Sequence, residues 1–210
     1  MPSISILLHE LSKLLAYAGA DASFVRMGTS GGIGIEPGTV VLTETVFNAE
    51  LKPYHRQVIL GKVVQRPTQC NDTLVGEIHE AAHQKVKGIS VIRANTMSAN
   101  DFYEEQGRVD GALCEYSEED RRKFLLNAHQ LGIRNIEMEA SAFVDFCTRM
   151  GFRAAVVCST LVDRLKGDQI SSTPEQLENY TQNSIQVATA WMRKTLEKTG
   201  EAAGERPKPS

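Results

Sequence analysis

Apolar positions recur at helical spacing along several stretches of the chain. In residues 3–20 the isoleucines and leucines stand three, four and seven positions apart, which predicts an amphipathic helix. Ser117 precedes Asp120 by three residues, close to a capping box, and Asn71 or Asp72 suits the N-cap of another helix. The spacing predicts four more helices, over residues 72–87, 117–131, 140–150 and 174–199.

Short apolar and β-branched runs separate these helices. They predict strands over residues 23–27, 39–44, 57–64, 89–94, 133–138 and 154–160. The alternation of helices and strands predicts an α/β fold with a central mixed β-sheet flanked by helices. Because no repeat or linker divides the chain, we expect one domain over residues 1–199. Residues 200–210 are rich in glycine, proline and charge, so we expect a disordered tail there.

Composition narrows the function classes. A hydrophobic share of 41% and a charged share of 23% are typical of a globular domain, and no apolar run is long enough to cross a membrane. The net charge is −3 and the basic residues are scattered, which argues against a nucleic-acid partner. His9, Glu10 and Lys13 interrupt the N-terminal apolar stretch, so we expect no signal peptide and a cytoplasmic protein.

A cation and two hydroxyls stand at the end of one apolar strand, just before a glycine-rich turn. Arg26 lies inside the run that begins at Phe24, and Thr29 and Ser30 precede the glycines. A buried arginine needs a partner, and its planar fork matches phosphate oxygens. Glycines let backbone N–H groups approach an anion closely. The segment therefore suggests a phosphate site, although a strand followed by a tight turn also explains it.

A second polar segment follows the strand expected over residues 89–94. Phe102 offers a face for stacking, and Gln106 can donate and accept hydrogen bonds at once, as the edge of uracil requires. Arg108 can stabilise charge that grows on a carbonyl oxygen. A solvated polar loop with one aromatic anchor explains the same residues, and both interpretations stay open.

Two carboxylates flank a methionine where a strand meets a helix. Glu137 and Glu139 stand on either side of Met138. Glu139 complements the helix dipole, which explains it without any function. Glu137 is polar at the end of an apolar run, so its carboxylate could hold two adjacent hydroxyls of a sugar, with Met138 packed beneath the ring. Alternatively the pair caps the helix that follows, because carboxylates favour helix N-termini.

His79 and His83 form a His-Glu-x-x-His pattern, which in zinc proteases places two imidazoles and a carboxylate on one helix face. Glu104 or Glu105 could then supply a third ligand. However, both histidines stand at the edge of the apolar stripe of an amphipathic helix, where histidines are common. We therefore expect no metal here, and a zinc hydrolase remains the weakest alternative.

These segments, in this order, resemble the nucleoside phosphorylase family, most closely its eukaryotic uridine phosphorylases. The resemblance runs over nearly the whole chain, to Gly167-Asp168-Gln169-Ile170, and implies a three-layer α/β/α fold. By resemblance, Arg26 and Thr29 match the phosphate ligands of the family. The residues around the base are matched by Phe102, Gln106, Arg108 and Arg164. The ribose ligands are matched by Met138 and Glu139.

The resemblance implies reversible phosphorolysis, in which uridine and phosphate give uracil and ribose 1-phosphate. It implies inorganic phosphate as co-substrate, no metal or organic cofactor, and a homo-oligomer built from dimers. Gln106, Arg108 and Arg164 would be the catalytic residues, because they would stabilise the departing uracil as negative charge builds on it.

The chain also departs from the family pattern. It starts at the helix before the phosphate strand, so about a third of the usual domain, with further phosphate contacts, has no counterpart. We therefore expect an N-terminally truncated phosphorylase with little activity, or a non-catalytic subunit that pairs with a full-length partner through residues 3–20. Asp163 stands where purine enzymes of the family carry an aspartate that protonates the base, but the uracil signature outweighs it.

Overall fold

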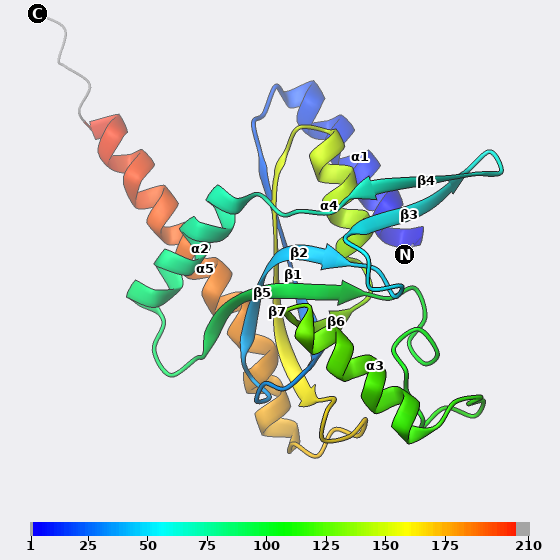
Figure 1. The fold of residues 1–210 in the computed structure, drawn as a ribbon. Helices are drawn as coiled ribbons and strands as arrows, with labels where there is room; N and C mark the ends of the chain where they lie inside the picture. The colour runs from blue at the N-terminus through cyan, green and yellow to red at the C-terminus, as the bar shows by residue number, and fades with distance from the viewer. Residues whose placement is uncertain (1, 205–210) are drawn as a thin grey trace, which may run out of the picture.

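The computed structural model describes residues 2–204, and the side chains of residues 3–197 (Figure 1). Helices and strands alternate through this part of the chain, as the apolar pattern predicts. The helices are α1 (Pro2–Ala18), α2 (Asp72–Lys85), α3 (Glu118–Gln130), α4 (Ala140–Arg149) and α5 (Pro174–Gly204). The strands are β1 (Ser23–Gly32), β2 (Val40–Phe47), β3 (Tyr54–Ile59), β4 (Lys62–Pro67), β5 (Val91–Ser98), β6 (Ile133–Glu137) and β7 (Arg153–Asp163).

Five strands form a mixed sheet that closes on itself in the order β1-β6-β5-β2-β7. β1 runs parallel to β7, β2 runs parallel to β5 and antiparallel to β7, and β5 runs parallel to β6. The closing contact joins Gly31 and Gly32 of β1 to Ile136 and Asn135 of β6. The expected α/β class and mixed sheet are confirmed, and the sheet closes into a barrel.

A bulge lies beside the closing contact. The register between β1 and β7 shifts after Ser30, so that Gly31 pairs with Val162 and Leu161 of β7 is the extra residue. A bulge increases the local twist of a strand pair, and this one lies where β1 meets β6. Both glycines are needed there, since a Cβ on Gly31 would lie 3.0 Å from the Arg164 side chain and one on Gly32 would lie 3.0 Å from a carbonyl oxygen.

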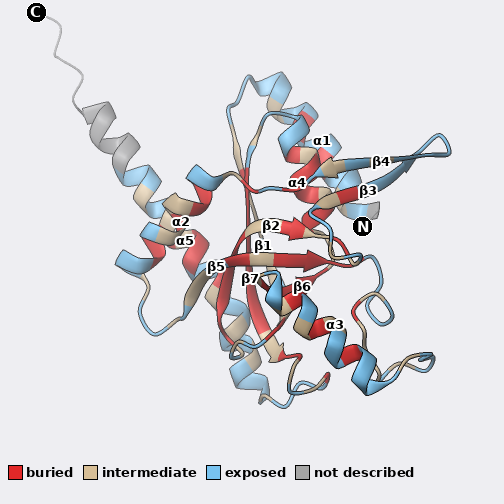
Figure 2. Cartoon of the chain, viewed as in Figure 1, coloured by how far each residue is buried: buried red, intermediate tan, exposed pale blue. Residues whose placement is uncertain are grey.

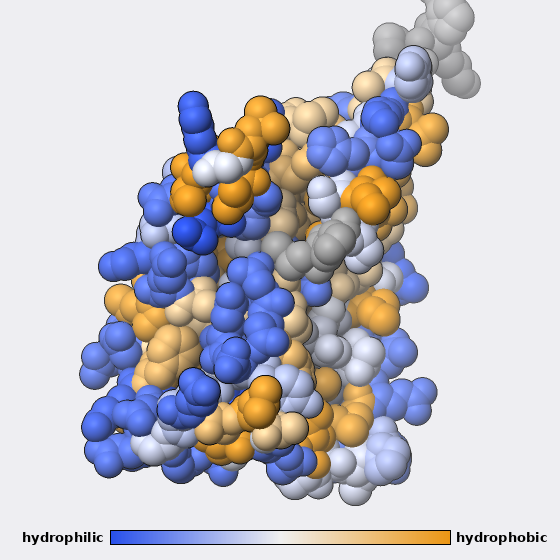
Figure 3. All heavy atoms as spheres, turned by 90° about the vertical axis from the view of Figure 1, so that its right-hand side faces the viewer, coloured by the Kyte–Doolittle hydropathy of each residue, from blue (hydrophilic) through white to orange (hydrophobic). Residues whose placement is uncertain are grey.

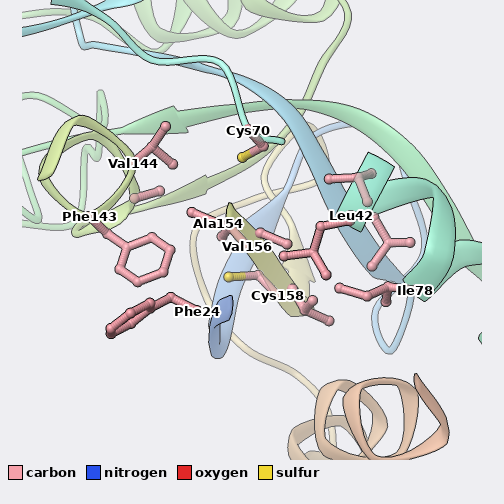
Figure 4. Close-up of a cluster of buried hydrophobic side chains, with 14 of the residues drawn as sticks. Phe24, Leu42, Cys70, Ile78, Phe143, Val144, Ala154, Val156 and Cys158 are labelled. Atoms are coloured by element: carbon pink, nitrogen blue, oxygen red, sulfur yellow. The ribbon is translucent and has the colours of Figure 1, made fainter. Parts of the chain in front are cut away.

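The main core lies between the barrel strands and the helices outside them. Leu42, Val156 and Cys158 from the strands meet Ile78 of α2, with Phe24 and Phe143 nearby (Figure 4). α2 packs beside α5, and α1 beside α4, while α3 covers a second buried cluster under β6. Figure 2 shows the barrel strands buried and the outer helix faces exposed. Together the two clusters leave the carboxyl ends of β1, β6 and β7 free to carry side chains for chemistry.

Local capping signals in the sequence are confirmed. The side chain of Asn71 accepts a hydrogen bond from the Leu74 N–H at 2.9 Å and caps α2. Ser117 and Asp120 form a complete capping box at the start of α3. These caps satisfy N–H groups that have no partner within a helix.

Two predicted elements differ from the structure. The single strand expected over residues 57–64 is wrong, because Leu60 and Gly61 form the two-residue turn of the β3–β4 hairpin. Apolar residues continue through that turn, so the pattern hides it. α5 runs to Gly204, five residues into the expected tail, and residues 205–210 lie outside the described residues.

Candidate functional site

A cavity of about 470 Å³ opens at the carboxyl ends of β1, β6 and β7. The β5–α3 and β7–α5 loops complete its wall, at the lower right of the barrel in Figure 1. Crevices at strand carboxyl ends are common ligand sites in α/β proteins. Seven of the eight predicted site residues line it: Thr29, Phe102, Gln106, Arg108, Met138, Glu139 and Arg164. Their roles as ligands remain predictions.

Arg26, the eighth predicted residue, lies behind the cavity wall. One of its guanidinium nitrogens is 3.0 Å from a Glu137 oxygen and donates to the Cys158 sulfur at 3.3 Å, and the other donates to Glu139. Burial alone would lower the pKa of Arg26, but Glu137 and the other partners outweigh it and raise that pKa. Arg26 is therefore a cation already neutralised by two carboxylates.

Glu137 and Glu139 have different local tasks. The buried carboxylate of Glu137 accepts hydrogen bonds from the N–H groups of Glu139 and Ala140, each at 2.9 Å, and so caps α4. Burial raises the pKa of Glu137, while Arg26 and these N–H groups act in the opposite direction. The side chain of Glu139 makes no cap bond and lines the cavity. The capping interpretation thus holds for Glu137, whereas Glu139 pairs with Arg26 and also lines the cavity, where a ligand can reach it.

Cations within the cavity gather at one end. Among the described residues that line it, Arg108 and Arg164 are the cationic ones. The guanidinium of Arg108 lies 4.5 Å above the centre of the Phe102 ring, a cation–π contact that fixes both side chains. Arg108 also forms a two-pronged pair with Asp110 at 3.0 and 2.8 Å, and this hydrogen bonding raises the pKa of Arg108.

Arg164 is buried and braces Gln106. Its guanidinium donates to the main-chain oxygen of Gln106 at 2.9 Å and to the Gln106 side-chain oxygen at 3.4 Å. Its Nε donates to Asp168 at 2.7 Å. Burial lowers the pKa of Arg164, and Asp168 opposes this effect. With its oxygen turned to Arg164, the Gln106 side chain has its amide N–H groups free to donate to a planar ring.

Asp163 has a structural task. Its carboxylate accepts hydrogen bonds from the N–H groups of Gly34 and Leu165, at 2.9 and 3.1 Å, and it is not among the described cavity-lining residues. It ties the end of β7 to the turn after β1.

Several residues of this wall escaped the sequence argument. Asp168, Gln169 and Ile170 line the cavity from the β7–α5 loop. They belong to the segment that resembles the family, but the sequence argument gave none of the three a role. Loop residues at strand ends often carry function.

The two histidines of the His-Glu-x-x-His pattern lie on α2, at the opposite end of β5 from the loop that holds Glu104 and Glu105 (Figure 1). Glu104 and Glu105 line a different cavity, with Tyr116 and Phe124. Within residues that the structure describes, no three metal-binding side chains come together. The geometry therefore gives a zinc hydrolase no support.

Fold and cavity can now be compared with those of known proteins. Residues 2–197 match the model of the phosphorylase superfamily, and the chain belongs to this superfamily.

Among particular relatives, the chain is 45% identical to uridine phosphorylase 1 of Mus musculus, over 93% of this chain and 63% of that protein. It is 40% identical to inactive uridine phosphorylase B of Schistosoma mansoni, over 92% of this chain and 66% of that protein. The crystal structure of S. mansoni uridine phosphorylase in complex with 5-fluorouracil matches with a TM-score of 0.90 and 42% identity, covering 94% of this chain and 69% of that one. The chain thus spans less than two thirds of the mouse relative.

Proposed function

We propose that this protein acts in pyrimidine salvage and catalyses the reversible phosphorolysis of uridine to uracil and ribose 1-phosphate. One observation carries the proposal: Gln106, Arg108 and Arg164 converge at one end of the cavity that also holds Met138 and Glu139. That arrangement offers donors for a planar base beside a carboxylate for sugar hydroxyls. The likeness to uridine phosphorylases of mouse and S. mansoni supports the same substrate.

At the base end, the side chains suit a pyrimidine that leaves as an anion. Gln106 pairs with the edge of the ring, and Phe102 supplies an apolar face beside it. As the bond between base and sugar breaks, negative charge develops on the base. Arg108 and Arg164 stabilise that charge, and because both are held by carboxylates they need little rearrangement.

At the sugar end, Glu139 accepts hydrogen bonds from the ribose hydroxyls, and Met138 packs beneath the ring. Phosphate binds beside Thr29, stabilises the positive sugar and attacks its anomeric carbon. Arg26 would contribute to this step only after it exchanges its contact with Glu139 for the phosphate. Within the described residues, Arg26 is therefore the cation at the phosphate end, and two carboxylates already pair with it.

This pairing also favours a second candidate function, a phosphorylase-like subunit that binds ligand without turnover. The inactive relative from S. mansoni shows 40% identity to the chain. A phosphate dianion in a partly dry site needs more positive charge than one paired arginine provides. Phosphate-dependent release of uracil separates the two functions.

Titration calorimetry with uracil tests the proposal on residues 1–210. We expect uracil to bind at one site, and Gln106→Ala and Arg108→Ala each to weaken it at least about tenfold, as loss of a paired hydrogen bond in a binding site does. Glu104→Gln is the matched control, because Glu104 belongs to the same loop but faces another cavity. Unchanged affinity in both alanine variants, or preference for the purine hypoxanthine, would refute the proposal.

We also propose a cellular location for the protein. The four cysteines are free, which fits a reducing compartment such as the cytoplasm. Of the described helices, none has the length and apolar character needed to cross a bilayer.

We also propose a homo-oligomer built from dimers. Apolar side chains gather on the face shown in Figure 3, on the side where the β3–β4 tip and α1 lie. They include Leu60 at the hairpin tip, 98% exposed, and Leu7 and Leu14 on α1. Extended apolar patches commonly mark protein interfaces.

A further inference from the structure

One carboxylate joins the arginines of the base end. Oδ1 of Asp168, in the β7–α5 loop, accepts hydrogen bonds from Nε of Arg164 at 2.7 Å and Nε of Arg121 at 3.2 Å. The other carboxylate oxygen accepts from the Val109 N–H at 3.1 Å, and the main-chain oxygen of Asp168 accepts from Arg108 at 3.0 Å. Asp168 thus contacts both arginines that line the cavity.

The cluster is almost dry. The side chains of Arg121, Arg164 and Asp168 are 4%, 1% and 4% exposed. Buried guanidinium groups repel one another unless a carboxylate lies among them, and each buried N–H needs an acceptor. Asp168 meets both needs, since its carboxylate accepts from both Arg121 and Arg164. Arg121 also donates to the Arg164 carbonyl.

Asp168 also links two loops that are distant in sequence. Its contacts with Arg108 and Val109 hold the β5–α3 loop, which carries Phe102 and Gln106, against the β7–α5 loop. Asp168 therefore holds Arg164 through its carboxylate and Arg108 through its main-chain oxygen.

We infer that Asp168 is a positioning residue, which aims Arg108 and Arg164 at the base and thereby sets the affinity for uracil. The inference rests on the proposed function, but its first test needs no ligand. That test measures how firmly the Asp168 carboxylate holds the arginine side chains.

The first test follows hydrogen exchange of arginine Nε–H groups by nuclear magnetic resonance. In the unaltered chain we expect slow exchange at Arg121 and Arg164, because both N–H groups are buried and bonded to Asp168. Asp168→Asn should speed exchange at both at least tenfold and leave Arg26 unchanged. Asp163→Asn is the matched control, since Asp163 is also a buried carboxylate but, among the described residues, it pairs with Lys166 and backbone N–H groups instead of an arginine side chain. Unchanged exchange in Asp168→Asn would overturn the inference.

The second test is a double-mutant cycle on uracil affinity. Asp168→Asn should weaken uracil at least tenfold and leave phosphate affinity unchanged, whereas a general loss of structure would weaken both. In an Arg164→Gln background the same change should weaken uracil less than threefold, because residues that act through one another are not additive. A full tenfold loss in that background would contradict the positioning role.

The two tests separate failure of the proposed function from failure of the inference on Asp168. If the unaltered chain binds no uracil, the proposed function is wrong, and the exchange measurement alone decides the role of Asp168. If Asp168→Asn lowers the melting temperature, Asp168→Glu replaces it, because Glu keeps the charge. Slow exchange should then persist at Arg164, and fast exchange there would overturn the inference.

Discussion

At the scale of single residues, Arg26 shows how one buried charge organises the site. The sequence predicts a partner for it, because an arginine inside an apolar strand cannot stay unpaired. The partners are two glutamates of the β6–α4 junction, and Glu137 is in turn held by two backbone N–H groups. Arg26 therefore supports the junction that presents Glu139 to the cavity.

Replacing Arg26 should destabilise the fold in a pH-dependent way. Arg26→Gln leaves Glu137 buried without its cation, which typically costs about 3–5 kcal/mol of unfolding free energy near neutral pH. Burial already raises the pKa of Glu137, and loss of Arg26 raises it further. The folded variant therefore takes up a proton at higher pH than the unfolded chain does, so its deficit grows as pH rises above the ordinary carboxyl range and shrinks on acidification.

Urea unfolding at pH 5 and pH 8 measures this difference. The double variant Arg26→Gln with Glu137→Gln is the control, since it removes both charges and should lose less stability at pH 8. A deficit that is equal at both pH values would contradict the buried-pair account.

At the scale of elements, short sequence signals predicted the features that depend on neighbouring residues. The caps of α2 and α3 lie where Asn71 and Ser117 predicted them, because a cap depends on a few neighbouring residues. The closure of the barrel was not predictable in this way, since it involves a bulge in β7 opposite Gly31 and the pairing of β1 with a strand far along the chain. The β3–β4 turn was missed because its first residue is leucine.

That turn offers a stabilising substitution. Leu60 and Gly61 both have positive φ, 48° and 79°, which favours asparagine and glycine in a two-residue hairpin turn. Leu60→Asn should raise the unfolding free energy by about 0.5–1 kcal/mol, because asparagine tolerates the left-handed region better than leucine.

Thermal unfolding with Gly61→Ala as a counterpart tests this, since the alanine should be destabilising at the same turn. A lower melting temperature for Leu60→Asn would show that the exposed leucine contributes more by contact than it loses in backbone strain.

At the scale of the whole molecule, the cavity is assembled from four separate stretches of the chain. The residues that resemblance singled out fall into it, with Arg26 directly behind. The full set of contacts of Asp168 could not be predicted from the sequence, because only Arg164 stands nearby, and the partners Arg121 and Arg108 stand 47 and 60 residues away. Networks of this kind appear only when the chain is folded.

The uneven charge of the cavity predicts weak catalysis by residues 1–210 alone. With one paired cation at the phosphate end, uracil release from uridine should be at least about a hundredfold slower than in the mouse relative, since one preorganised charged contact typically contributes that much. The rate should still rise with phosphate at concentrations that saturate an efficient phosphorylase. Turnover comparable with that relative would show that Arg26 suffices.

A crystal structure of residues 1–210 grown with uridine and phosphate tests the central claim most directly. We predict the base in the cavity within hydrogen-bonding distance of Gln106 and Arg108, with the ribose hydroxyls on Glu139. Nucleoside density in another cavity, such as the one lined by Tyr116 and Phe124, with this cavity free of it, would contradict the account.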